Sequence, residues 1–307
     1  MASGIEETIG YAEKWAEVGD LSVRYLDWGG DGPTVLALHG LASSANWYDL
    51  LSPMLRKNYR IIAPDQRGHG RTTQARSGYD WQTLSSDAVA LLDNLGIDRA
   101  AVLGHSWGGN VAINLAADAP DRIDALVMID GGTFGARRAS SQDWTWEYFK
   151  DRAAPRDVSG TREDFLKRMS RQLSICWNEQ VARVVQTMVW EDESGQMHDI
   201  LRPDNHAQVL RAMWDHPASD TWPNIKCPTL IVPAGPLPER ADSEFAVWKR
   251  EGVAAASMAI PSNRVRWIPE TIHDIGYHKP RELAQVIDEF LTEVLPRAQE
   301  PDAEAGA

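Results

Sequence analysis

The sequence predicts an α/β fold in which a mostly parallel sheet is covered by helices on both faces. Short apolar runs recur along the 307-residue chain and alternate with segments of helical period. These runs are nearly continuous rather than alternating, which is typical of strands covered on both faces, as in parallel sheets. The alternation of elements and the apolar character of the strands together carry the fold prediction.

Each element can be assigned in chain order. Residues 14–18 and 21–28 alternate in polarity around a Gly-Asp pair, which predicts an edge hairpin. Asp80 is a typical N-cap for a helix that Gly96 ends, and Pro280 opens the last helix. The other predicted elements are strands at 34–38, 60–64, 100–103, 125–129, 229–232 and 264–268, and helices at 47–55 and after Ser106.

The alternation of strands and helices stops after the predicted strand at 125–129. Residues 133–222 carry helical patches and many charges but no buried strand, so we expect an inserted helical unit. Residues 1–132 and 223–307 would then form the core domain. The acidic, Ala-rich residues 297–307 are expected to be a frayed tail.

Composition narrows the class of protein. The formal net charge of −13 argues against nucleic acid or an anionic membrane surface as a partner. No apolar run approaches the roughly 20 residues that span a bilayer, and residues 1–10 lack the apolar core of a signal peptide. We expect a cytoplasmic protein, monomeric or homodimeric, in which Cys176 and Cys227 are free buried thiols.

The most informative stretch has the pattern Gly-x-Ser-x-Gly at Gly104, Ser106 and Gly108. An apolar run ends at the first glycine, and a helix of small residues begins after the serine. A turn this tight brings strand and helix backbones together, so both flanking positions must be glycine. Ser106 is therefore a candidate nucleophile, provided that a histidine and an acid approach it.

With this turn in place, the chain resembles the α/β-hydrolase superfamily, in its branch of capped serine esterases and lactonases. Three further motifs match in order: His39-Gly40 after strand 34–38, the sequence DQRGHG at 65–70, and His273 with Pro280 seven residues later. The resemblance covers 20–135 and 223–296. It implies an eight-stranded, mostly parallel sheet with a helical cap inserted after the sixth strand.

The resemblance also implies site residues. Ser106 would be the nucleophile and His273 the general base, with His278 as the nearest rival. The backbone N–H groups of Leu41 and Trp107 would bind the oxyanion. No cofactor and no metal are implied.

The chain departs from the family pattern in the position of the catalytic acid, the carboxylate that would orient the general base. Relatives most often place it just after the strand at 229–232, where this chain has Leu237 or Pro238. Asp130, at the end of strand 125–129, is the first candidate, because other branches take the acid from there. Glu239 remains an alternative if the later loop is longer than usual.

The chain has 13 tryptophans, and the resemblance implies that an insertion after the sixth strand lies over the mouth of the active site. Some of those in the inserted unit, with Leu41, Trp47 and Trp107, are expected to line an apolar pocket. The six in the inserted unit are Trp144, Trp146, Trp177, Trp190, Trp214 and Trp222.

The expected activity is cofactor-independent hydrolysis of a small hydrophobic ester or lactone through an acyl-enzyme. A proline-iminopeptidase-like enzyme and a carbon–carbon bond hydrolase remain open, as does a non-catalytic small-molecule receptor on the same fold. Epoxide hydrolases and haloalkane dehalogenases resemble this architecture but need a carboxylate at the position of Ser106.

Overall fold

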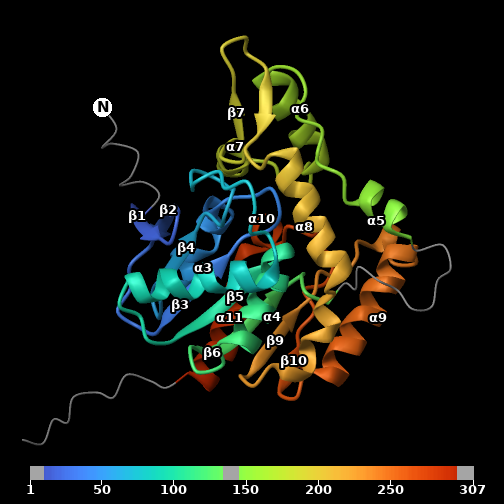
Figure 1. Cartoon of the computed structure of the whole chain (residues 1–307). Coiled ribbons are helices and arrows are strands. Elements are labelled where there is room, and N and C mark those ends of the chain that lie inside the picture. Colours follow the sequence, from blue (N-terminus) through green and yellow to red (C-terminus); the bar gives the residue numbers. More distant parts are fainter. Residues whose placement is uncertain (1–9, 134–144, 296–307) are drawn as a thin grey trace, which may run out of the picture.

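The computed structural model describes residues 10–133 and 145–295 and is built around one large sheet (Figure 1). Its eight strands lie in the order β1-β2-β4-β3-β5-β6-β9-β10. The pairs β1–β2 and β2–β4 are antiparallel, and the other pairs are parallel. The strands are β1 Ala12–Val18, β2 Leu21–Asp27, β3 Thr34–Leu38, β4 Arg60–Pro64, β5 Ala100–His105, β6 Ile123–Ile129, β9 Thr229–Val232 and β10 Asn263–Val265. This topology confirms the predicted α/β-hydrolase fold.

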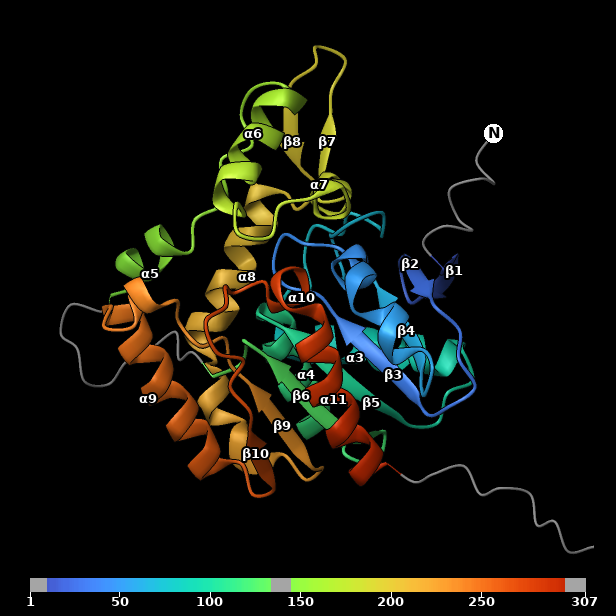
Figure 2. The same ribbon diagram turned by 180° about the vertical axis from the view of Figure 1, so that it is seen from behind.

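Helices cover both faces of the sheet. On one face α3 (Trp81–Asn94), α4 (Trp107–Asp118) and α9 (Glu244–Ala259) pack on side chains such as Val102 and Met128. On the other face, α11 (Pro280–Val294) packs against the alternate side chains of the same strands (Figure 2). The strands between the two edge strands β1 and β10 are therefore buried on both sides, as their apolar runs predict.

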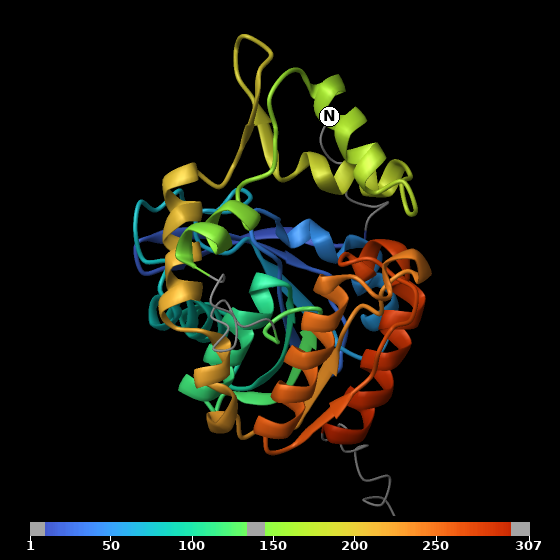
Figure 3. The same cartoon turned by 90° about the vertical axis from the view of Figure 1, so that its right-hand side faces the viewer.

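The segment between β6 and β9 is mostly helical and lies over one end of the sheet (Figure 3). Its described elements are α5 Trp146–Arg152, α6 Arg162–Gln172, α7 Glu179–Gln186, β7 Val189–Glu191, β8 Met197–Asp199, α8 Pro203–Asp215, and the 3-10 turns η2 Ala218–Asp220 and η3 Trp222–Asn224. The β7–β8 hairpin was not expected, because three-residue strands are too short to show a polarity pattern. Trp144 and the tail at 297–307 lie outside the described residues.

Three elements differ from the sequence assignment. The predicted helix at 47–55 is two short pieces, η1 (Ala45–Leu50) and α2 (Ser52–Leu55), because Pro53 lacks an N–H and starts a new turn. The strand predicted at 264–268 is shortened to β10, followed by one bridge between Ala234 and Ile268. Helix α9 has no counterpart in the sequence assignment. The short elements η4 (Pro238–Arg240) and α10 (Ile275–His278) complete the described chain.

Within residues 10–133 and 145–295, no helix is long and apolar enough to cross a membrane.

Candidate active site

Ser106 lies at the apex of a strained turn between β5 and α4. Its backbone has φ +54° and ψ −121°, a conformation that L-residues rarely adopt. A Cβ on Gly104 would lie 2.3 Å from the carbonyl oxygen of Gly108, and one on Gly108 would lie 2.2 Å from that of Leu38. Both positions therefore require glycine, for the reason that the spacing of the motif predicts.

His273 joins Ser106 to Asp130 across the carboxyl ends of three strands. It lies in the loop between β10 and α10. Its Nε2 is 2.8 Å from Ser106 Oγ, and its Nδ1 is 2.6 Å from Asp130 Oδ2. In the tautomer protonated on Nδ1, the imidazole donates to the carboxylate and accepts the serine hydroxyl proton.

Asp130 is turned toward His273 by the backbone that follows β6. It is one of few non-glycine residues with positive φ, at +42°. A Cβ on the next residue, Gly131, would lie 2.0 Å from the carbonyl oxygen of Ser106, so the loop passes directly beneath the nucleophile turn. Asp130 Oδ1 accepts the N–H of Ala234 at 2.9 Å, and Lys249 Nζ lies 2.8 Å from each carboxylate oxygen.

The electrostatics of this pair are set by burial and by charge. Burial opposes ionisation of the Asp130 carboxyl, but the hydrogen bond from His273 and the charge of Lys249 outweigh it and hold the pKa well below its usual range. Desolvation lowers the pKa of His273, yet the hydrogen bond and charge of Asp130 raise it above the ordinary 6.5. His273 is thereby a stronger base than a free imidazole.

Glu239 is not brought to this site. It lies in the exposed turn η4 and does not line the cavity above Ser106. The loop after β9 instead approaches Asp130 with a backbone N–H, that of Ala234. The structure thus places Asp130, rather than Glu239, at the ring of His273.

Leu41 and Trp107 line the cavity beside Ser106. Trp107 is the first residue of α4, so its N–H precedes the first intrahelical hydrogen bond. Leu41 follows Gly40, whose added Cβ would lie 3.1 Å from Ser106 Cβ. Both backbone segments therefore pass close to the serine, as an oxyanion site requires.

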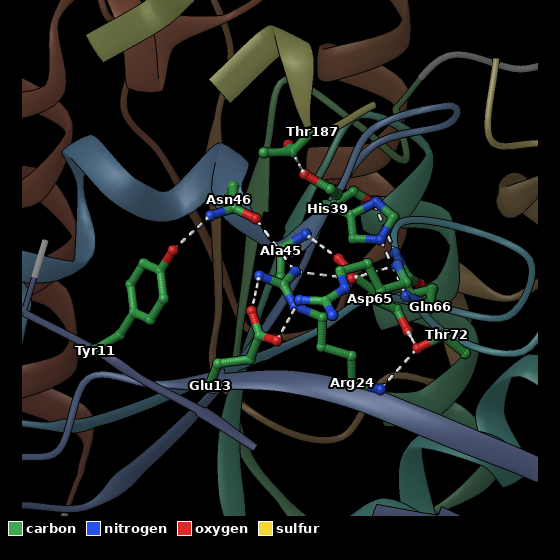
Figure 4. A network of polar contacts seen from close by, with 12 residues as sticks. Tyr11, Glu13, Arg24, His39, Ala45, Asn46, Asp65, Gln66, Thr72 and Thr187 are labelled. Atoms are coloured by element: carbon green, nitrogen blue, oxygen red, sulfur yellow. Dashed lines mark hydrogen bonds and ion pairs between the residues drawn. The ribbon is translucent and has the colours of Figure 1, made fainter. Parts of the chain in front are cut away.

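A buried polar network fixes the loop that carries Leu41 (Figure 4). Asp65 accepts hydrogen bonds from Ala45 N–H at 2.7 Å and from the Arg24 guanidinium at 2.8 Å. His39 Nε2 accepts the N–H of Gln66 at 3.0 Å. The His39-Gly40 and DQRGHG motifs thus bind each other and hold the loop in place.

The other histidines near the site have structural partners. Burial lowers the pKa of His39 to about 4 and that of His69 to about 3. In each of these histidines, both ring nitrogens form hydrogen bonds with backbone groups. His105 is stacked on Trp47 with ring centroids 4.0 Å apart. His278, the rival base, has its Nδ1 3.0 Å from Thr271 Oγ1 and does not line the cavity.

A cavity of about 520 Å³ opens above Ser106, between the sheet and the inserted segment. Its polar side includes Arg152, Arg156 and His206. Arg156 pairs with Asp199 at 3.3 Å and donates to the carbonyl oxygen of Ala42, so it ties the inserted segment to the loop of Leu41. The inserted segment contributes six large apolar side chains to the lining: Met169, Leu173, Val185, Met188, Leu210 and Met213.

The expected pocket lining is confirmed for Leu41 and Trp107 and wrong for the other described tryptophans named for it, none of which lines the cavity. Trp47 lies behind His105, Trp190 is 51% exposed, and Trp222 donates its indole N–H to Gly132. The remaining described ones pack elsewhere: Trp146 and Trp214 around Phe149, and Trp177 against the core.

The fold of this chain, its serine turn after β5 and its histidine after β10 are together typical of α/β hydrolases. A family model described as alpha/beta hydrolase fold matches residues 33–232, most of the chain. The chain belongs to this family.

Two curated relatives match less than half of the chain. The acetyltransferase component of the acetoin cleaving system of Pseudomonas putida is 38% identical over 133 residues, which are 43% of this chain and 36% of the relative. The soluble epoxide hydrolase of Corynebacterium sp. (strain C12) is 36% identical over 117 residues, 38% of this chain and 40% of the relative. The chain thus spans less than half the length of either relative.

Solved structures match over nearly the whole chain. E-2-(acetamidomethylene)succinate hydrolase superimposes with a TM-score of 0.76 at 19% identity, over 92% of this chain and 99% of that one. The enol-lactonase of Burkholderia xenovorans LB400 gives 0.64 at 19% identity, over 91% and 100%. At these identities the likeness establishes the fold alone.

Proposed function

We propose that the protein is a serine hydrolase that cleaves a carboxylic ester or lactone through an acyl-enzyme. One observation carries the proposal: the unbroken row of hydrogen bonds from Ser106 through His273 to Asp130, at 2.8 and 2.6 Å. Nucleophile, base and orienting acid are therefore within the distances that proton transfer requires.

In the proposed reaction, Ser106 Oγ attacks the carbonyl carbon while His273 Nε2 takes its proton. The imidazolium formed is stabilised by the Asp130 carboxylate on the opposite ring nitrogen. The imidazolium then protonates the leaving alkoxide, and an acyl-enzyme remains. A water molecule, deprotonated by the same imidazole, releases the acid and restores Ser106.

The developing oxyanion needs donors that exist before the substrate arrives. We assign this role to the N–H groups of Leu41 and Trp107. Trp107 supplies the free N–H of a helix N-terminus, where the helix dipole also favours negative charge. The His39–Gln66 contact and the Asp65 network keep the Leu41 loop from relaxing away from this position.

The volume and lining of the cavity favour a small substrate with an apolar portion. The six Met, Leu and Val side chains of the inserted segment provide apolar surface for this portion. The methionines among them can adapt to irregular shapes. We propose that the inserted segment, residues 133–222, acts as a cap that completes this pocket. A small hydrophobic ester or lactone fits this arrangement.

The test is hydrolysis of a panel of p-nitrophenyl esters and lactones by the wild type and by Ser106→Ala. The proposal requires a loss of about 10³-fold or more in kcat, with the variant still folded. A fluorophosphonate probe should label the wild type and leave the variant unlabelled. Undiminished turnover by Ser106→Ala would exclude the mechanism, and labelling without turnover would favour the receptor alternative.

A further inference from the structure

Lys249 is a charged group beside the catalytic residues that no sequence motif singles out. It lies in the second turn of α9, and its side chain is only 13% exposed. Its ammonium nitrogen is 2.8 Å from Asp130 Oδ1 and 2.8 Å from Oδ2. The carboxylate that orients His273 is therefore held from a second side by a largely buried cation.

All three protons of this ammonium group are used. Besides the two carboxylate oxygens, Nζ lies 3.3 Å from the carbonyl oxygen of Ala234. The ring of Phe245, one turn earlier on α9, lies 5.4 Å from Nζ. Lys249 borders the cavity but has no N–H left for a substrate, so its partner is Asp130 itself.

Helix α9 can approach the loop after β6 this closely because of a glycine. A Cβ on Gly252 would lie 2.3 Å from the carbonyl oxygen of Thr133, in the loop that follows Asp130. The glycine lets the helix backbone touch that loop, one turn beyond Lys249. Since α9 also packs on the sheet through Val253 and Ala256, the ammonium group is fixed relative to β6.

We infer that Lys249 is a positioning residue that locks the rotamer of Asp130 and, through it, the orientation of the His273 ring. The inference rests on the proposed serine-hydrolase function. Ala234 N–H binds Asp130 Oδ1, His273 Nδ1 meets Oδ2, and Lys249 bridges the two oxygens. Without Lys249 each oxygen keeps a single partner, and the plane of the carboxylate is held less firmly.

The cation also acts through its charge. The charged groups around His273 are Asp130 after β6, Lys249 on α9 and Asp274 beside it in the chain, with the neutral ring of His105 at 4.8 Å. Lys249 is the only one of these that disfavours the imidazolium ion. Its removal should raise the pKa of His273 and move the acid limb of the rate profile to higher pH.

The test compares Lys249→Met and Lys249→Arg with Lys226→Met, a matched change at an exposed site. For Lys249→Met we expect a 10- to 100-fold loss in kcat with little change in KM, as a rough value for a misplaced catalytic group. The acid limb of kcat/KM should rise by about 0.5–1 pH unit. Lys249→Arg keeps the charge and should keep the wild-type acid limb, and Lys226→Met should match the wild type throughout.

A double variant separates positioning from a purely structural role. In an Asp130→Asn background, Lys249→Met should lower kcat by less than about threefold, because the group it positions is already lost. Thermal unfolding confirms that each variant is folded. An unchanged kcat and acid limb in Lys249→Met, or an equal loss in both backgrounds, would overturn the inference. Activity that survives Ser106→Ala would instead overturn the proposed function.

Discussion

Replacing Asp130 by Asn tests the acid assignment most directly, because the structure dictates how the amide must lie. The position of Oδ1 faces the backbone N–H of Ala234, which can only donate, while the Lys249 ammonium lies 2.8 Å from both oxygen positions. The amide oxygen therefore takes the Oδ1 position, because the imidazole at the Oδ2 position can change its tautomer and the peptide N–H cannot. The NH₂ group is thereby turned toward His273, where the carboxylate had accepted the Nδ1 proton at 2.6 Å.

An NH₂ group at that position donates to Nδ1, so the neutral imidazole carries its proton on Nε2. The nitrogen that faces Ser106 Oγ at 2.8 Å can then no longer accept the serine proton. The size of the side chain is unchanged, so the loss is one of tautomer rather than of packing. A kcat reduced by about 10⁴-fold is expected from this effect.

The assay is steady-state hydrolysis of the best p-nitrophenyl ester, followed at the isosbestic wavelength of nitrophenol. Glu239→Gln serves as the matched control and should stay within about twofold of the wild type, since an exposed surface change has little effect. Retention of more than a tenth of the wild-type kcat by Asp130→Asn would refute the reasoning. A large loss in Glu239→Gln alone would transfer the acid role to that residue.

Three further predictions concern pH and backbone geometry. The pKa of His273 is raised above 6.5, so kcat/KM should fall as pH falls through a value above 6.5; a profile flat down to about pH 5 would contradict this. Burial lowers the pKa of His39 to about 4 and that of His69 to about 3, so below about pH 6.5 the unfolded chain binds more protons than the folded chain. The free energy of unfolding should therefore decrease from about pH 6.5 as pH falls through these folded-state values. The measurement is the melting temperature as a function of pH, which should decline over this range. Gly131→Ala places a Cβ 2.0 Å from a backbone oxygen and should cost more than about 3 kcal/mol in urea unfolding. Gly96→Ala, at positive φ but with open space around it, should cost about 1 kcal/mol. Equal costs for the two alanines would contradict the steric argument.

The parts of the site that could be predicted from sequence are those whose chemistry is local. Gly104 is required by its contact with Gly108, four residues on, so the motif alone indicates the turn, whereas Gly108 is required by the backbone of Leu38 in the neighbouring strand. His273 lies 167 residues away, and only its motif near the start of the last helices points to it. The fold was predictable for a similar reason, because apolar strands and amphipathic helices carry their own periodicity.

The parts that could not be predicted depend on packing between distant elements. Lys249 is one of many charged residues on a helix with no motif, and only the approach of α9 to β6 brings it to Asp130. The positions of most tryptophans were predicted wrongly for a related reason. Large aromatic side chains fill whatever interior space is near, and Trp47 fills the space behind His105 rather than the cavity.

The departure at the acid position has a simple geometric basis in the pairing of β6 with β9. These strands are parallel neighbours, and Ile129 is in register with Val232. Their following loops therefore leave the sheet side by side, and a carboxylate from either loop can reach the ring of His273. Here the β6 loop supplies the carboxylate and the β9 loop supplies Ala234 N–H to hold it. The requirement is that an oxygen lies at Nδ1 of the imidazole, and this is why a chain with Leu237 and Pro238 after β9 still has a complete row of hydrogen bonds.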